Sequence, residues 1–222
     1  MNMNNLIRKF LTLDSSSISD ALDSFKISGG LLGIKPLVPG LKCAGFAYTV
    51  KYEPIHDPTE FQNAGNYIDR VPEDAIIVID NGDRNDCTTW GGILTEVALQ
   101  KKINGTIIHG SARDVATIRE KQYPIFSSSV FMQSAKNRAR KVAENITVYI
   151  KHVKVEPGDL IFCDDNGCVA IPAHLALEVA ERAGNVLETE NKIIQAIKNG
   201  MPLEEARNKY GYSKPWEKEP II

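Results

Sequence analysis

The stretch from residue 75 to residue 109 constrains the fold more than any other part of the chain. Residues 75–79 form the longest unbroken apolar run, and Asp80 ends it. A polar segment (81–88), a helical pattern (90–102) and a second apolar stretch (106–109) follow. Two strands joined by a helix of this length are typical of a parallel βαβ unit with a right-handed crossover. We therefore expect a mixed α/β protein with a loop at residues 81–88.

The remaining elements are predicted around this unit. Asn166-Gly167 between two apolar runs predicts a hairpin. Strands are expected at residues 43–52, 147–155, 160–163 and 168–171, and helices at residues 6–13, 18–24, 61–69, and from His174 to about Tyr210. Because no linker-like segment interrupts the chain, we expect a single domain over residues 1–222. Its core covers about residues 15–200, with an N-terminal helix (1–14) and a C-terminal extension (201–222).

Charge and composition exclude several classes of protein. With 26 basic and 28 acidic side chains the net charge is -2, so the chain has no electrostatic footprint for nucleic acid or an anionic membrane. A membrane-spanning helix needs roughly 20 apolar residues. The first residues lack the apolar region of a signal peptide, so we expect a cytoplasmic protein with no membrane contact and no direct nucleic-acid binding. The four cysteines and four histidines show no zinc-site spacing, which favours buried thiols.

Two segments at the carboxyl ends of the predicted parallel strands are candidates for a functional site. The first ends in the paired glycines Gly91 and Gly92 at a helix start, where backbone N–H groups are accessible to a carboxylate or phosphate. The second carries Arg113 and Asp114 directly after the second strand. From the residues alone, a simple helix cap is the better interpretation of Asp114.

A resemblance to a known family adds to this interpretation. The motif Trp-Gly-Gly-Ile-Leu at residues 90–94, followed by His-Gly-Ser-Ala-Arg-Asp-Val at 109–115, resembles the core motif of the family containing regulator of ribonuclease activity A and 4-hydroxy-4-methyl-2-oxoglutarate aldolase. Shorter matches extend the resemblance over residues 15–200. It implies an α/β fold, an αββα sandwich resembling swivelling phosphohistidine-like domains, with N- and C-terminal helices. It also implies a homotrimer or a dimer of trimers with sites between subunits.

The resemblance also implies an activity and assigns residues to it. Catalytic members are Mg²⁺- or Mn²⁺-dependent lyases that release pyruvate from small anionic 2-oxo acids, by aldol cleavage or by decarboxylation of oxaloacetate. By position, Asp114 would hold the metal, Arg113 would bind the ketone oxygen, and the backbone amides of Gly91, Gly92, Ile93 and Leu94 would hold the substrate carboxylate. These residue types suit the reaction, because a cation and a guanidinium stabilise an enolate and a carboxylate prefers Mg²⁺ or Mn²⁺.

The sequence departs from the family at two acidic positions. An acid that commonly stands 21 residues before the arginine is replaced by Gly92, and one three residues after the aspartate is replaced by Thr117. Aldol cleavage needs a base for the substrate hydroxyl, whereas decarboxylation does not, so the departures favour decarboxylation. Candidate substitutes, or residues that shuttle protons, are Asp83, Asp86, Glu96, His109, and Glu188 or Glu190 from a neighbouring subunit; each could instead be an ordinary surface or packed residue.

Three hypotheses remain open at this point. The first is a metal-dependent carbon–carbon lyase on small 2-oxo acids. The second is a non-catalytic regulator that binds a protein partner such as a ribonuclease, which the missing acid at Gly92 favours. The third is an enolate-stabilising site for another substrate, such as a sugar acid.

Overall fold

The computed structural model describes residues 3–57 and 64–216, and the chain divides into two compact units. The sheet unit comprises residues 30–173, and the helical unit comprises residues 1–29 together with 174–222. The expectation of a single domain stays a prediction. No helix in the described ranges is long and apolar enough to span a bilayer.

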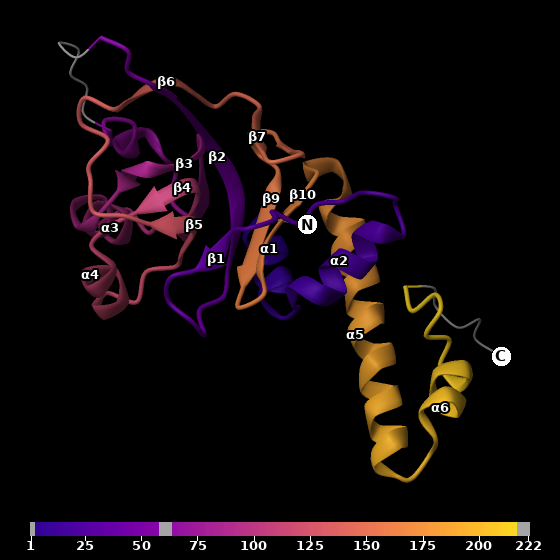
Figure 1. The fold of residues 1–222 in the computed structure, drawn as a ribbon. Helices are drawn as coiled ribbons and strands as arrows, with labels where there is room; N and C mark the ends of the chain where they lie inside the picture. Colours follow the sequence, from indigo (N-terminus) through magenta and orange to yellow (C-terminus); the bar gives the residue numbers. More distant parts are fainter. Residues whose placement is uncertain (1–2, 58–63, 217–222) are drawn as a thin grey trace. The chain divides into compact units, whose positions relative to one another are not determined.

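A mixed β-sheet dominates the sheet unit (Figure 1). Within the described residues its strand order is β1-β5-β4-β3-β2-β9-β10. The strand β6 also pairs with β2, at residues 50–54, whereas β9 pairs with residues 43–46 of β2. Strands β2 to β5 run parallel to one another, and the other pairings are antiparallel. The strands are β1 (Lys35–Pro36), β2 (Cys43–Pro54), β3 (Ala75–Trp90), β4 (Gly105–Ala112), β5 (Ile125–Val130), β6 (Ala139–Glu144), β9 (Leu160–Asp164) and β10 (Gly167–Ile171). A separate hairpin consists of β7 (Val148–Ile150) and β8 (Val153–Val155).

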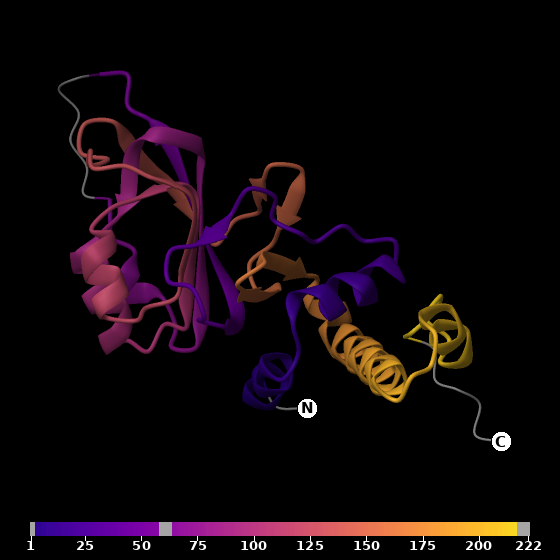
Figure 2. The ribbon, with the colours of Figure 1, turned by 60° about the horizontal axis from the view of Figure 1, so that its bottom comes forward.

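The parallel strands bury both faces, which explains their continuous apolar character. One face packs under α3 (Gly92–Gln100) and α4 (Val115–Glu120), with Ile77, Ile108 and Trp90 in that core (Figure 2). The opposite face, which includes Val78 and Ile107, packs with residues of β7, β8, β9 and β10. Because side chains alternate along a strand, odd and even positions of residues 75–79 belong to different cores, as do Ile107 and Ile108. Trp90 lies beyond the register shifts of β3 and joins the core of Ile77.

The structure confirms a mixed α/β fold with a central mixed sheet, and it includes the predicted βαβ unit (β3-α3-β4) and the hairpin at Asn166-Gly167. Two predictions were wrong. Residues 81–88 are not a separate loop, because β3 continues to Trp90 and follows β4 through three register shifts. Residues 147–155 are not one strand, since Lys151 and His152 form the turn between β7 and β8. The closer relation to swivelling domains stays a prediction.

The helical unit contains α1 (Met3–Leu11), α2 (Ser15–Asp23), α5 (Ala176–Lys198) and α6 (Leu203–Lys209). Asp14 caps α2, and its Oδ1 accepts a hydrogen bond of 2.7 Å from the Ser17 N–H. Ala206 of α6 packs against Ile193 and Ala196 of α5, so α6 folds back along the end of the longer helix. The predicted helix at residues 61–69 falls partly outside the described residues; the described portion includes a short 3-10 helix, Ile68–Arg70.

A charged cluster around Glu144 ties three elements of the sheet unit together. Glu144 accepts hydrogen bonds from Arg70 Nε at 3.2 Å and Nη2 at 2.5 Å, from Lys141 Nζ at 2.7 Å, and from the Tyr48 hydroxyl. Hydrogen bonding from Arg70, with further donation from Lys141 and Tyr48, lowers the pKa of Glu144 from 4.5 to about 2, although partial burial opposes this. The cluster joins β6 to β2 and to the 3-10 helix.

Candidate active site

A cleft of about 380 Å³ lies on the helix-covered side of the sheet unit. Four segments form it: the end of β3 with the start of α3, the segment that follows β4, the residues around the 3-10 helix, and the segment with Ser134 and Lys136. Its lining includes Thr88–Leu94, Val97, Arg113, Asp114, Ser134, Lys136 and residues 64–66, 68 and 69. Of the residues predicted for the site, the structure brings Gly91, Gly92, Ile93, Leu94, Arg113 and Asp114 together here.

Asp114 is held against the start of α3 by one well-defined hydrogen bond. Its Oδ2 accepts from the Gly92 N–H at 2.8 Å. The residue has a φ of 58°, in the left-handed region that non-glycine residues adopt only rarely. Aspartate tolerates this conformation better than most residues, and such outliers often occur at functional sites. Because Gly92 donates its N–H to Asp114, the next amides along α3, those of Ile93 and Leu94, are the ones available to a ligand.

The backbone of Gly91 packs directly against the side chains of Arg113 and Asp114. A Cβ atom at this position would lie 2.5 Å from Asp114 Oδ2 and 3.2 Å from Arg113 Nε. No side chain fits there unless the carboxylate moves. The Arg113 N–H donates to the Trp90 carbonyl at 3.1 Å, and Arg113 Nε lies 3.8 Å from Asp114 Oδ2. The glycine turn therefore holds Arg113 through a backbone hydrogen bond and Asp114 through a side-chain hydrogen bond.

Gly92 has space that Gly91 lacks. A Cβ at Gly92 would meet Thr117 Cγ2 at 3.5 Å and Asp114 Oδ2 at 3.6 Å, which are ordinary van der Waals contacts. The backbone at the position of the missing acid can therefore accommodate a side chain. Such a side chain would begin next to both Asp114 and Thr117, the second position at which an acid is absent.

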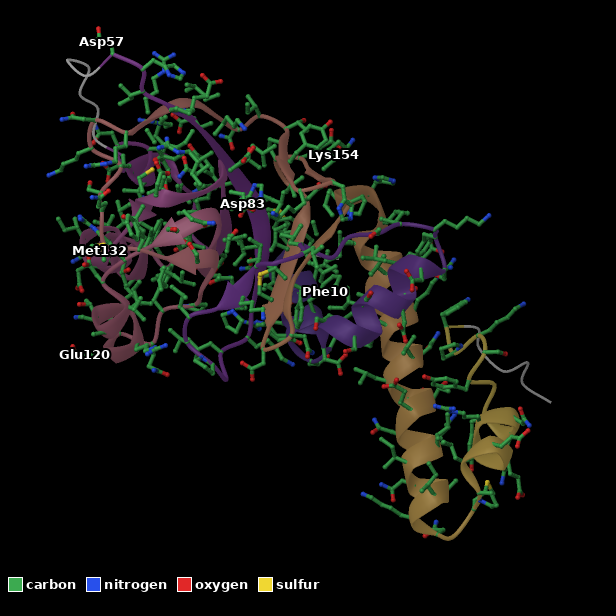
Figure 3. All side chains as sticks on the ribbon, viewed as in Figure 1. Phe10, Asp57, Asp83, Glu120, Met132 and Lys154 are labelled. Carbon is green, nitrogen blue, oxygen red and sulfur yellow. The ribbon has the colours of Figure 1, made fainter. Side chains whose placement is uncertain are left out.

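The proposed substitutes for that acid form ion pairs with nearby cations, and none of them lines the cleft. Asp83 pairs with Lys151 of the β7–β8 turn. Asp86 pairs with Arg84 at 2.7 Å, and Glu96 pairs with Lys121 at 3.1 Å. Figure 3 shows Asp83 well separated from Met132, the neighbour of the 133–136 segment beside the cleft.

His109 lies in a buried polar row on the other face of the sheet. Lys51, Asp80 and His109 stand opposite one another on β2, β3 and β4. Asp80 Oδ2 accepts from Lys51 Nζ at 2.6 Å, and Asp80 Oδ1 lies 3.2 Å from His109 Nδ1. Burial opposes ionisation of Asp80, yet the hydrogen bonds from His109 and Lys51 lower its pKa from 3.8 to about 2. His109 shares its face with Ile107, whereas the cleft lies on the face of Ile108.

Glu188 and Glu190 belong to α5 in the helical unit. Glu188 pairs with Lys192 at 3.0 Å. Partial burial, together with the negative charges of Asp14 and Asp20, raises the pKa of Glu190. A role for either glutamate in a neighbouring subunit stays a prediction.

The cleft also contains charged and polar residues that the sequence did not indicate: Lys136, Ser134 and Asp69. The segment with Ser134 and Lys136 reaches the site because it forms a parallel bridge to Thr88, in which the Thr88 N–H donates to the Gln133 carbonyl and the Ala135 N–H to the Thr88 carbonyl. Local sequence carries no signal for such a bridge. The basic character of residues 136–141 was the one feature that could have drawn attention to it.

The fold and this site define the class of protein. Residues 15–170 match the RraA-like family, whose description is Aldolase/RraA, and the chain belongs to that family.

Named relatives fall in the same group. Protein DlpA of Legionella pneumophila is 46% identical over 215 residues, which are 96% of this chain but 35% of that protein, so the chain spans about a third of its length. A Halalkalibacterium halodurans protein named "Putative 4-hydroxy-4-methyl-2-oxoglutarate aldolase" is 28% identical over 181 residues, 80% of this chain and 81% of that protein. The crystal structure of an uncharacterised protein from Pseudomonas syringae pv. tomato superposes with a TM-score of 0.88 at 46% identity, covering 93% of this chain and 94% of the other.

Proposed function

We propose that the chain is a divalent-metal-dependent carbon–carbon lyase that releases pyruvate from small anionic 2-oxo acids. The observation that carries the proposal is the meeting of Arg113, Asp114 and the N-terminus of α3 around Gly91 in one cleft. Family membership supports the reaction class.

The chain's own groups would bind the two ends of the 2-oxo acid unit. The Ile93 and Leu94 amides at the start of α3 would hold the carboxylate, because a helix N-terminus presents unpaired N–H groups and a partial positive charge. The Arg113 guanidinium would donate to the ketone oxygen. When the neighbouring carbon–carbon bond breaks, negative charge develops on that oxygen, and a fixed guanidinium stabilises it more in the transition state than in the ground state.

The donors present fit Mg²⁺ or Mn²⁺. In the described part of the chain, no group of three or more His, Cys, Asp or Glu side chains is arranged to hold a metal. Two carboxylates line the described part of the cleft, Asp69 and Asp114. Asp114 is the one beside the arginine, and its Oδ2 is fixed by the Gly92 N–H. Mg²⁺ is commonly held by one or two carboxylates, with water and substrate as further ligands. Bound there, the cation would supply Lewis-acid stabilisation of the enolate.

Decarboxylation of an oxaloacetate-type substrate fits the site better than aldol cleavage of a 4-hydroxy-4-methyl-2-oxoglutarate-type substrate. Decarboxylation requires only enolate stabilisation and later protonation, whereas aldol cleavage also requires a base for the C4 hydroxyl. Gly92 and Thr117 supply no acid, and Asp83, Asp86 and Glu96 are engaged by cations elsewhere. Asp69 is the other carboxylate among the described cleft residues.

A coupled pyruvate-release assay tests the proposal. Wild type is compared with Arg113→Ala and Asp114→Asn, on oxaloacetate and on 4-hydroxy-4-methyl-2-oxoglutarate, with Mg²⁺, Mn²⁺ or a chelator. Asparagine is chosen because it accepts the left-handed backbone at position 114 and can still accept the Gly92 N–H while removing the charge. We expect metal-dependent release that each substitution lowers by at least about 100-fold. Full activity in Arg113→Ala, or with chelator, would contradict the site.

A non-catalytic regulator that binds a protein such as a ribonuclease is the second candidate. Three large apolar side chains favour a protein contact: Ile93 in the cleft wall is 82% exposed, and Met132 and Val130 are 72% and 53% exposed. The same surface suits the homotrimer or dimer of trimers that we propose for the lyase. Stable capture of a ribonuclease by a chain without any pyruvate release would favour the regulator.

A further inference from the structure

Lys136 approaches the cleft from the side opposite to Arg113. Thr88 of β3 pairs with Ser111 of β4 along one edge and with Ser134 along the other. Arg113 follows two residues after Ser111, and Lys136 follows two residues after Ser134. Neighbouring strands lie about 4.8 Å apart, so the two backbones are separated by roughly 10 Å with the Gly91 turn between them. Both side chains belong to the lining of the same cleft.

The turn that carries Lys136 is fixed by hydrogen bonds. The Lys136 N–H donates to Ser134 Oγ at 3.1 Å, and Arg138 Nη1 donates to the carbonyls of Ser134 and Lys136, both at 3.2 Å. Arg138 is held in turn, because its carbonyl accepts from Arg84 Nη1 at 2.7 Å. The backbone of Lys136 is therefore anchored to β3.

Among the described residues, no neighbour neutralises the charge of Lys136. Throughout residues 3–57 and 64–216, no carboxylate lies within ion-pair distance of its ammonium group, whereas Lys51, Lys121 and Lys151 each have one. A cleft with Arg113 and Lys136 on opposite sides of a helix N-terminus has three separate sources of positive potential. A single carboxylate can use the helix terminus, which leaves Lys136 for a second anionic group.

We infer that Lys136 is a specificity-determining residue that binds the distal carboxylate of a dianionic 2-oxo acid. This inference rests on the proposed function and deepens it. The 2-oxo acid end lies against Arg113 and the start of α3, and the far carboxylate lies against the Lys136 ammonium. A monocarboxylic 2-oxo acid with a methyl group at the far end leaves Lys136 without a partner and binds less tightly.

One pair of ligands separates this role from general binding. 2-Oxoglutarate and 2-oxopentanoate share the 2-oxo acid end and differ at the far end, carboxylate against methyl. Their affinities are measured by titration calorimetry with Mg²⁺ for wild type, Lys136→Met and Lys136→Arg. The control is Lys154→Met, which removes a lysine of β8 that is 54% exposed and paired with Glu156. Oxaloacetate decarboxylation supplies KM for a reacting dianion in the same variants.

We expect Lys136→Met to weaken 2-oxoglutarate binding and to raise the oxaloacetate KM by at least about 10-fold, the effect of one charge-assisted hydrogen bond. Binding of 2-oxopentanoate should change less than about 2-fold, and Lys136→Arg should restore dianion binding. Equal losses for both ligands, no loss for the dianion, or the same loss in Lys154→Met would overturn the role of Lys136. A wild type that binds neither ligand would overturn the proposed function, and this inference with it.

Discussion

Substituting Gly91 by alanine tests the geometry of the site most directly. Gly91 has φ -162° and ψ -167°, an extended backbone that alanine adopts without strain. The added Cβ would lie 2.5 Å from Asp114 Oδ2. A comfortable carbon–oxygen contact is nearly 1 Å longer, so the carboxylate must move by about 1 Å. The perturbation therefore acts on Asp114 and not on the conformation of the turn.

The size of the effect follows from what that movement breaks. The hydrogen bond of 2.8 Å from the Gly92 N–H to Asp114 is charge-assisted, and such bonds contribute about 1.5–3 kcal/mol. A misplacement of about 1 Å in a reacting constellation costs on the order of 100-fold in rate. We therefore expect kcat/KM for oxaloacetate to fall by about 100-fold in Gly91→Ala. The free energy of unfolding should fall by no more than about 3 kcal/mol.

The adjacent glycine provides the matched control. In Gly92→Ala the new Cβ would make ordinary contacts of 3.5 Å to Thr117 Cγ2 and 3.6 Å to Asp114 Oδ2. Gly92 is the first residue of α3 and has no positive φ. Because alanine restricts the unfolded chain more than glycine does, by about 0.4–1 kcal/mol, this variant should be at least as stable as wild type. Steady-state kinetics and thermal unfolding of both variants should show a much larger activity loss in Gly91→Ala. Equal losses in the two variants would refute the steric argument.

Further predictions concern stability, thiol reactivity and reaction type. The pKa of Glu144 is about 2 in the folded chain against an ordinary 4.5, so its contribution to stability is present above pH 4.5 and is lost as the pH falls towards 2. Glu144→Gln should therefore flatten the pH dependence of the free energy of unfolding between pH 4.5 and 2, measured by denaturant unfolding. The same substitution should cost about 1–3 kcal/mol at pH 7. A hydrogen bond with Cys163, joined by burial, raises the pKa of Cys43, and burial raises the pKa of the other three thiols. A thiol reagent should therefore label the native chain far more slowly than the denatured chain at all four buried cysteines: Cys43, Cys87, Cys163 and Cys168. Gly92→Asp should raise aldol cleavage relative to decarboxylation by at least tenfold, since a positioned base contributes about 10²- to 10⁴-fold; a ratio unchanged from wild type in the pyruvate-release assay would show that the missing acid does not limit the reaction.

The sequence predicted the βαβ unit because the pattern of apolar residues differs strongly between its two continuous apolar strands and its helix. It did not predict the course of residues 81–88, whose polar residues are typical of a turn. These residues remain strand because tertiary contacts hold both ends: Asp80 is bonded to Lys51 and His109, and Thr88 bridges to Ser134. Such pairings join residues far apart in the chain and leave no local pattern. Lys136 was missed for the same reason.

The arrangement of charges explains how a chain of net charge -2 could collect an anion. Its overall field offers an anionic substrate no attraction, so binding must depend on local cations. Several acids along the elements that build the site are matched with cations of their own: Asp80 with Lys51, Asp83 with Lys151, Asp86 with Arg84, and Glu96 with Lys121. Within each pair, the positive charge offsets the negative charge at short range. Among the described residues, Arg113, Lys136 and the N-terminus of α3 are thereby left as the positive groups lining the cleft. Asp114, which lines the same cleft, is the residue that we propose to hold the cation.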